Sequence, residues 1–96
     1  GTDSFAYALA NHASEFIPRA AAKWAGHGVL TNVVRIGVTD TPIHEAFPGR
    51  DMAARASLIP MHRLAEPGEV AALILDLGTE RNTYITGQVT AVSGGE

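Results

Sequence analysis

The sequence contains no cysteine. Disulfide bonds, thiolate metal sites and a cysteine nucleophile are therefore excluded, and this composition is typical of a cytoplasmic protein. Long hydrophobic runs are also missing, so we expect no segment to cross a bilayer. The first residues do not combine a basic segment with an apolar core, and we expect no signal peptide.

Positive charge is scarce. Lys23 is the only lysine, and together with six arginines it leaves a net charge of -3 at pH 7. The arginines are scattered along the chain, so no basic stripe could follow a phosphate backbone. Aromatic residues make up only 6% and offer no platform on which bases could stack. Nucleic-acid binding is therefore not expected.

What remains is an ordinary globular composition, with 46% hydrophobic and 18% charged residues in a chain of 96. This length is enough for one small domain.

Residues 4–26 are predicted to form a long helix, because apolar side chains recur at helical spacing. Ser4 could cap its start, and Gly26 or Gly28 could end it. Pro18 lies inside this helix, where a proline removes a hydrogen bond at a cost of about 3 kcal/mol. We therefore expect the helix to kink or split there.

Two segments are predicted to be strands. Residues 29–36 are almost continuously apolar and rich in β-branched side chains, which is typical of a strand covered on both faces in a parallel sheet. Residues 84–92 alternate between apolar and polar side chains and would form the last strand. Gly87 in this strand suggests that another backbone approaches it closely.

The segment between the strands is predicted to be loop and helix. Residues 38–50 are loop-like, residues 51–58 could form a short helix capped by Asp51, and residues 67–77 form a helix with Pro67 in its first turn. The order is typical of α/β alternation, with parallel strands joined by a helical crossover. Two strands are few for a parallel sheet, so the pattern predicts the end of a larger doubly wound fold.

Four stretches resemble the short-chain dehydrogenase/reductase family, in the family's order. They are SFAY at 4–7, LTNVVRIGVTDTP at 30–42, RLAEPGEVA at 63–71 and YITGQVTAVSGG at 84–95. The second is similar to the family's strand that ends in Asn-x-Val-x-Pro-Gly, and the third to the start of its last long helix. Together they are specific for the family but not for a substrate.

The resemblance implies that residues 1–96 are the C-terminal part of a single Rossmann-type domain. This chain would supply the last two strands of a doubly wound parallel sheet, in three α/β/α layers when complete. The implied activity is hydride transfer between NAD or NADP and an alcohol or carbonyl substrate, and residues 42–60 would form a substrate lid. The glycine-rich phosphate turn and the family's catalytic serine do not occur in this sequence.

Tyr7 is the candidate catalytic residue implied by the resemblance, because reduction of a carbonyl group needs a proton donor. The family has a lysine one helical turn later, where this chain has Asn11. An amide carries no charge and cannot lower the pKa of a phenol as a cation would. Lys23 lies several turns away and cannot replace the lysine. The alternative is that Tyr7 is an amphipathic-helix residue with its hydroxyl in solvent.

The alignment of the helix is itself open. If Asn32 is aligned with the family's strand asparagine and the helix has no gap, the family tyrosine falls on Ala6 and the lysine on Ala10. Matching Tyr7 therefore requires a one-residue deletion in the helix. The lysine is absent in either alignment.

The resemblance places the nicotinamide side of the cofactor on Ile36, Gly37, Val38 and Thr41. Gly37 would let the backbone approach the cofactor. Backbone groups of Val38 would meet the carboxamide, and the hydroxyl of Thr41 the amide or pyrophosphate. Ile36 stands where the family has proline. The alternative is that residues 39–42 are a turn and helix cap that needs no ligand.

A metal site is not expected. Asp40 and His44 are four residues apart and could share a helix face, but Pro42 lies between them and no third ligand is in register.

Three interpretations of the whole chain stay open. The first is a segment of an oxidoreductase, working with an N-terminal half. The second is an inactive relative that serves as a scaffold or oligomerisation module, which the missing lysine, Pro18 and Ser93 in place of the family's aspartate favour. The third is a truncated gene product. The family pairs through long helices and the last strand, so the resemblance also implies a homo-oligomer.

Overall fold

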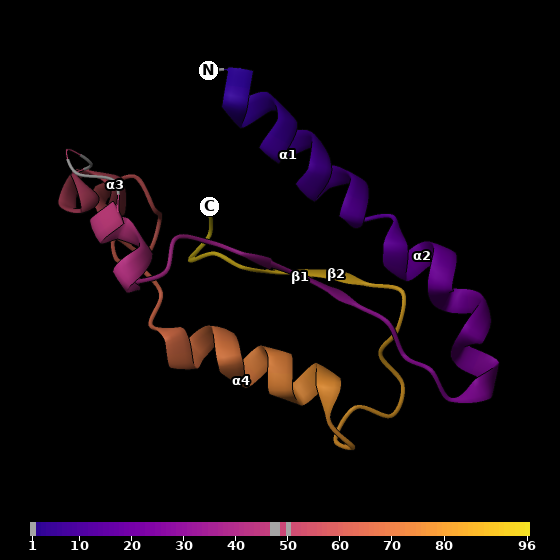
Figure 1. Ribbon diagram of the computed structural model, residues 1–96. Helices are drawn as coiled ribbons and strands as arrows, with labels where there is room; N and C mark the ends of the chain where they lie inside the picture. The colour runs from indigo at the N-terminus through magenta and orange to yellow at the C-terminus, as the bar shows by residue number, and fades with distance from the viewer. Residues whose placement is uncertain (1, 47–48, 50) are drawn as a thin grey trace.

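Two parallel strands lie between helices in the computed structural model, which describes residues 2–46, 49 and 51–96. β1 (Val33–Ile36) pairs with β2 (Val89–Val92) in a register that runs from Val33 opposite Val89 to Ile36 opposite Val92. The helical arm lies on one side of the strands and α4 (Pro67–Gly78) on the other (Figure 1). The predicted α/β class and parallel pairing are confirmed.

The N-terminal helix is split, as predicted. α1 (Thr2–Ser14) is followed by α2 (Ile17–Ala21) and a 3-10 helix, η1 (Ala22–His27). Pro18 lies in the first turn of α2, where a missing N–H has no intrahelical acceptor to lose. Gly28 ends the arm with a left-handed φ of 81°, which confirms one of the two predicted stops. Ser4 lies inside α1, so its prediction as the helix cap is wrong.

The break between α1 and α2 is tied to the sheet by an ion pair. Glu15 Oε1 accepts hydrogen bonds from Arg35 on β1, with distances of 2.9 Å to Nε and 2.8 Å to Nη2. The two residues are 20 positions apart in the sequence. Their pairing positions the end of α1 beside the strand.

Both strands are only four residues long and shorter than predicted, because side chains take over the hydrogen bonds of the chain before them. Thr86 Oγ1 accepts from the N–H of Thr31 at 2.9 Å. Asn32 Nδ2 donates to the carbonyl oxygen of Ile85 at 3.0 Å, and Asn32 Oδ1 accepts from the N–H of Gln88 at 3.1 Å. The segments are joined, but not as a regular ladder.

Gly87 lies close to the backbone of another segment, as predicted, because its N–H donates to the carbonyl oxygen of Thr31 at 2.8 Å. Glycine is required there by the backbone conformation and not by a steric clash. A Cβ atom there would lie 3.9 Å from both the Cβ of Ala22 and the carbonyl oxygen of Pro18, which is ordinary contact. Its φ of +73° is left-handed, a conformation that glycine adopts without steric cost.

The helices between the strands begin as their sequences predict. α3 (Met52–Ser57) starts where Asp51 Oδ1 accepts a hydrogen bond of 3.0 Å from the N–H of Ala54. α4 has Pro67 in its first turn and a reciprocal capping box between Glu66 and Glu69. The loop predicted after β1 contains a 3-10 helix, η2 (Pro42–Ala46). Residues 47, 48 and 50 of the predicted loop lie outside the described residues.

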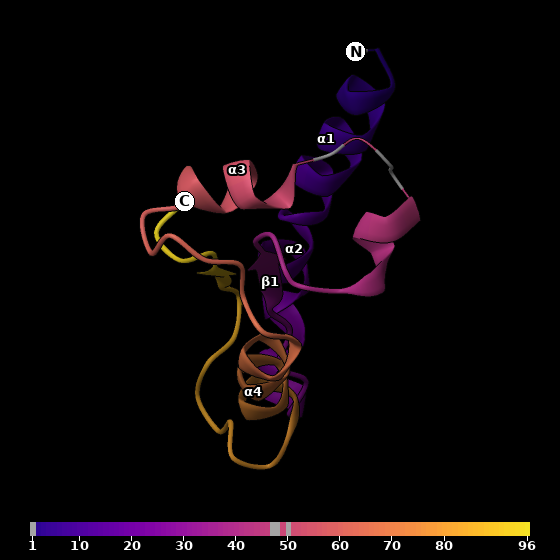
Figure 2. The same cartoon turned by 90° about the vertical axis from the view of Figure 1, so that its left-hand side faces the viewer.

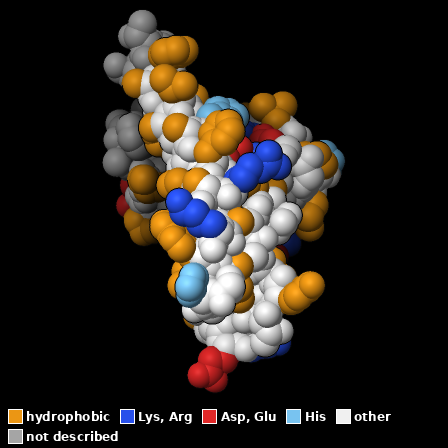
Figure 3. All heavy atoms as spheres, turned by 90° about the vertical axis from the view of Figure 1, so that its right-hand side faces the viewer, with side chains coloured by type: hydrophobic (Ala, Val, Ile, Leu, Met, Phe, Trp, Pro, Cys, Tyr) orange, Lys and Arg blue, Asp and Glu red, His pale blue; other side chains and the backbone are white. Residues whose placement is uncertain are grey.

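Few side chains are buried. Ala21, Ile59 and Val70 are the buried apolar residues among those described, together with Pro18. Large apolar side chains are exposed on the helical arm and on the strands. Figure 3 shows hydrophobic side chains scattered over one face of the molecule. Strands of a parallel sheet are normally covered on both faces, yet Ile36 is 53% exposed. Exposed apolar faces of this kind are typical of surfaces that contact other structure.

Candidate functional site

The five site residues predicted from the sequence line one cleft at the carboxyl end of β1, with a volume of about 1090 Å³. Ligands of open α/β sheets bind beyond the carboxyl ends of the strands, which is where this cleft lies. The predicted residues that line it are Tyr7, Ile36, Gly37, Val38 and Thr41. The other lining residues are Ser4, Thr39, Ile43, His44, Asp51, Met52, Arg55 and Glu96.

Tyr7 contributes the cleft's phenol group from α1. The residue is 73% exposed, so its side chain is open to a molecule in the cleft. Asn11 lies one turn later in the same helix, and Lys23 belongs to η1, beyond the break in the arm. Helix geometry therefore places an uncharged amide, and not a cation, on the next turn.

Gly37 is held closely by the end of β2. Its N–H donates to the carbonyl oxygen of Val92 at 2.8 Å. A Cβ atom on Gly37 would lie 2.8 Å from the Cα of Ser93 and 3.0 Å from the oxygen of Val92. The neighbouring strand alone therefore requires glycine at this position, independently of any cofactor.

The loop after Gly37 is braced by two short pairings. Thr39 forms an isolated parallel bridge with Ala65, in which Asp40 donates to the Ala65 carbonyl at 2.9 Å and Ala65 donates to the Val38 carbonyl at 3.0 Å. This bridge ties the loop to the segment that precedes α4. The loop is therefore held by the segment before α4, while its other residues border the cleft.

The turn predicted at residues 39–42 is present and leads into η2. Thr39 Oγ1 donates to the carbonyl oxygen of Gly37 at 3.0 Å, and the N–H of His44 donates to the carbonyl oxygen of Thr41 at 3.3 Å. The hydroxyl of Thr41 forms no hydrogen bond with another described residue. The turn thus forms without using this hydroxyl.

His44 also pairs with the backbone. Its Nε2 lies 2.7 Å from the carbonyl oxygen of Thr39, so the tautomer protonated at Nε2 donates there. In the described ranges 2–46 and 51–96, no group of three or more histidine, aspartate and glutamate side chains is arranged to hold a metal ion.

One pair of residues that lines the cleft was not predicted from the sequence. Arg55 on α3 forms a bidentate ion pair with Glu96, with distances of 2.6 Å from Nη2 to Oε1 and from Nη1 to Oε2. The C-terminal segment lies beside α3 (Figure 2). Hydrogen bonding within the pair raises the pKa of Arg55 and lowers that of Glu96. Their separation of 41 positions leaves no local signal in the sequence.

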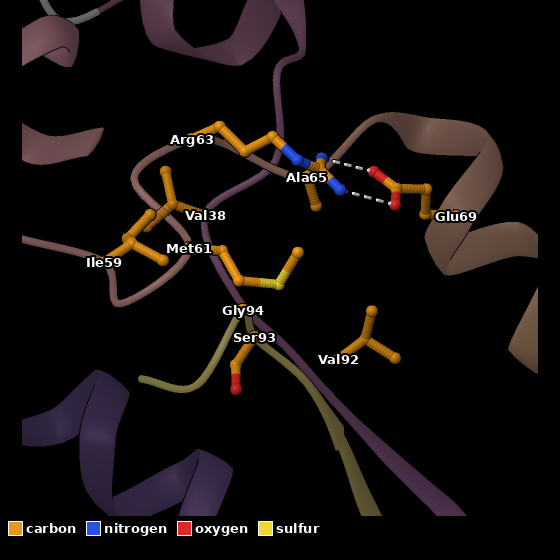
Figure 4. A pocket seen from close by; sticks show the side chains of 9 residues that line it. All are labelled: Val38, Ile59, Met61, Arg63, Ala65, Glu69, Val92, Ser93 and Gly94. Carbon is orange, nitrogen blue, oxygen red and sulfur yellow. Dashed lines mark hydrogen bonds and ion pairs between the residues drawn. The ribbon is translucent and has the colours of Figure 1, made fainter. Parts of the chain in front are cut away.

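A second, smaller cavity of about 110 Å³ is also bordered by Val38, which lines the cleft as well. Figure 4 shows Ile59, Met61 and Val92 around it, with the pair Arg63–Glu69 at its edge. Arg63 donates to both carboxylate oxygens of Glu69, at 2.7 Å and 3.0 Å. The hydrogen bonds from Arg63, and then from the backbone of Glu66, lower the pKa of Glu69 to about 2.

Comparison with known proteins identifies the family. Residues 2–96 match the family model described as enoyl-(acyl carrier protein) reductase. The 3-oxoacyl-(acyl-carrier-protein) reductase FabG of Thermotoga maritima is 37% identical over 75 residues, covering 78% of this chain and 30% of that protein. An acetoacetyl-CoA reductase of Acinetobacter is 34% identical over 80 residues, covering 83% and 32%. The chain thus spans about a third of the length of these relatives.

Solved structures lead to the same family. The TT0495 protein of Thermus thermophilus is 33% identical with a TM-score of 0.79, covering 94% of this chain and 39% of that one. A short-chain oxidoreductase of Pseudomonas aeruginosa PAO1, described as containing an atypical catalytic center, is 31% identical with a TM-score of 0.76, covering 91% and 38%. The chain therefore belongs to the short-chain dehydrogenase/reductase family, and its strands and helices form part of that family's Rossmann-type α/β domain.

Proposed function

We propose that this chain is the C-terminal part of a domain that transfers hydride between NAD or NADP and an alcohol or carbonyl substrate. The observation that carries the proposal is the meeting of Tyr7 with the loop 36–41 in one cleft beyond β1. FabG of Thermotoga maritima is a reductase by name, and a solved relative with 32% identity is described as an NADPH-dependent reductase. These similarities support the reaction class and leave the substrate open.

The residues present fit the nicotinamide half of such a cofactor. The Val38 carbonyl is bonded to Ala65, whereas the Val38 N–H has no partner among the described residues and would meet the carboxamide. The Thr41 hydroxyl would bind the amide or pyrophosphate, and Ile36 and Gly37 would form the floor beneath them. When bound, the nicotinamide ring would supply or accept the hydride. The pyrophosphate needs a glycine-rich turn that this sequence does not contain.

Tyr7 would hold the proton that a substrate oxygen gains during reduction. A carbonyl oxygen becomes basic as hydride reaches its carbon, and a hydroxyl within hydrogen-bond distance can then donate to it. The ring of His44 also lines the cleft, but its Nε2 is paired with the Thr39 carbonyl. Tyr7 is therefore our choice for the donor, with Asn11 in place of the family's lysine.

The segment 42–60 would be the substrate lid. Its two helices, η2 and α3, both contribute side chains to the cleft, including Ile43 and Met52. Residues 47, 48 and 50 of this segment lie outside the described residues. The lid would place apolar side chains over a bound substrate.

Self-association and a cytoplasmic location belong to the same proposal. The apolar side chains of Phe5 and Leu9 are 71% and 58% exposed on α1, which suits pairing of helical arms in a homo-oligomer. None of the described helices is long and apolar enough to span a bilayer.

The proposal is tested with the protein expressed from its complete gene. Oxidation of NADH and NADPH is followed in the presence of a panel of ketones, aldehydes and 3-oxo esters. We expect Tyr7→Phe to lower kcat about 100-fold, because the variant loses its proton donor. Tyr84→Phe is the matched control, since Tyr84 is the other tyrosine, is 95% exposed and does not line the cleft.

Two results would contradict the proposal. Full activity in Tyr7→Phe would exclude Tyr7 as the proton donor. A folded protein that neither binds nor oxidises NADH or NADPH would exclude the oxidoreductase function and favour the scaffold hypothesis instead.

A further inference from the structure

Arg55 is the one arginine or lysine among the described residues that line the cleft. It lies on α3, in the segment proposed as the lid, and borders the same space as Tyr7. Its guanidinium group is permanently charged and presents a planar fork of N–H donors. An anionic group of a molecule bound beside α3 could pair with this cation.

Glu96 shows that the guanidinium group of Arg55 is arranged to bind a carboxylate. Its carboxylate occupies the fork with two parallel contacts of 2.6 Å, the geometry in which arginine recognises carboxylates. The side chains of Arg55 and Glu96 are 36% and 35% exposed, so the pair is accessible to solutes. A carboxylate brought by another molecule could therefore take the place of Glu96 with the same hydrogen bonds.

Such an exchange leaves no charge buried without a partner. Glu96 is itself exposed, so a displaced carboxylate would be hydrated by solvent. The other charged group that lines the cleft, Asp51, is engaged in capping α3. A neutral molecule carries no carboxylate that could replace Glu96, so it would leave the Arg55–Glu96 pair in place.

We propose that Arg55 determines specificity for substrates that carry a carboxylate, with Glu96 as an internal competitor that the substrate displaces. The apolar side chains of Ile43, Met52 and Val38 line the same cleft and would contact the rest of the molecule. The expected substrate is thus an oxo or hydroxy acid with an apolar body. This inference rests on the proposed oxidoreductase function for its meaning, but the anion site itself can be tested without turnover.

The test measures binding of benzoate and of benzamide by calorimetry to the protein expressed from its complete gene. The two probes have nearly the same shape and differ in charge. We expect Glu96→Gln to bind benzoate about tenfold more tightly than the unchanged protein, because the competing carboxylate is removed. Arg55→Gln should bind it about tenfold more weakly, and the affinity of Arg55→Lys should fall between those of Arg55→Gln and the unchanged protein. Benzamide binding should be the same in all variants.

Arg63→Gln is the matched control, because Arg63 forms the other bidentate pair with a glutamate among the described residues but does not line the cleft. Its benzoate affinity should equal that of the unchanged protein. Circular dichroism establishes that each variant is folded. If Arg55→Gln does not fold, Glu96→Gln still tests the proposal, because the expected gain of benzoate affinity cannot come from loss of structure.

Two results would overturn the proposal. One is a Glu96→Gln variant that binds benzoate no more tightly than the unchanged protein, or not at all. The other is an effect of equal size on benzamide, which would indicate a purely structural role. If the variants show the expected benzoate affinities but the protein has no nicotinamide-dependent turnover, only the oxidoreductase proposal is refuted. If turnover is found without these affinity changes, only the role of Arg55 is refuted.

Discussion

The two ends of β1 differ in whether polar side chains join the neighbouring segment. Before the strand, the side chains of Asn32 and Thr86 are engaged with the backbone of the neighbouring segment. After the strand, the hydroxyl of Thr41 has no described partner, and the loop that carries it borders a cleft. One end of the sheet is thus closed by side-chain hydrogen bonds, whereas the loop at the other end is held by the segment before α4 and borders an open cleft.

The largest expected effect is that of Gly37→Ala, which tests how tightly the open end is held. The new Cβ atom would lie 2.8 Å from the Cα of Ser93, and backbone must move to admit it. We expect the free energy of unfolding to fall by about 3 kcal/mol, measured by urea denaturation.

Gly68→Ala is the control for this substitution. Gly68 lies in α4 with no atom within 4 Å of an added Cβ, so alanine should stabilise the helix by about 0.5 kcal/mol. If Gly37→Ala proved as stable as the unchanged protein, the close approach of the two strand ends would be refuted.

The closed end is tested by Asn82→Ala. Asn82 is only 8% exposed, and its Nδ2 donates to the carbonyl oxygens of Leu77 at 3.0 Å and Ile85 at 2.8 Å. Its Oδ1 accepts from the backbone N–H of Ile85 at 2.8 Å. Removing these bonds leaves part-buried backbone groups of Leu77 and Ile85 without these partners, and we expect a loss of about 2 kcal/mol in urea denaturation.

Asn11→Ala provides the comparison, because Asn11 is exposed on α1 and alanine favours helix. Its unfolding free energy should stay equal or rise slightly. Equal effects of the two substitutions would mean that Asn82 does not close this end of the sheet.

The smallest expected effect concerns the ion pair between Arg63 and Glu69, at the start of α4. The pKa of Glu69 is about 2 in the folded protein, below the value near 4.3 of an unfolded chain. A lowered folded pKa stabilises the fold above the unfolded value, and this contribution is lost as the pH falls from about 4.3 through about 2. Arg63→Gln removes the main cause of the shift, so its stability should lose this part of the pH dependence.

The measurement is the urea midpoint of Arg63→Gln and of the unchanged protein between pH 2 and 6. The difference between the two should be largest at pH 6 and shrink toward pH 2. Arg81→Gln is the control, since Arg81 is 80% exposed and lies 3.5 Å from Asp76. A constant difference across the pH range would contradict the assigned pairing.

Most helix boundaries could be predicted because their signals are local. Asp51 caps α3 within three residues of itself, and Pro67 suits the first turn of α4 wherever that helix lies. The strand lengths could not be predicted, because they depend on bonds such as that of Thr86 to Thr31, 55 positions away. An apolar, β-branched run indicates a strand, but it does not show where side chains will replace the backbone hydrogen bonds between strands.

The candidate site shows the same division. Tyr7 and the loop 36–41 were found through the family resemblance, and the structure brings them to one cleft. Arg55 and Glu96 were missed, since neither belongs to a family motif and nothing near them in the sequence indicates a partner. The sequence did not favour His44 as a metal ligand, and it gave no sign that the ring lies against the Thr39 carbonyl.

Local signals in the sequence were enough to predict the split at Pro18, the starts of α3 and α4, the parallel α/β class and the family. Each depends on local backbone geometry, hydrophobic periodicity or a short motif. Two contacts emerge only in the folded chain: Ser93 lies so close to Gly37 that glycine is required there, and Arg55 pairs with Glu96 beside the cleft. These contacts depend on the path of the chain between distant residues, which no local pattern encodes.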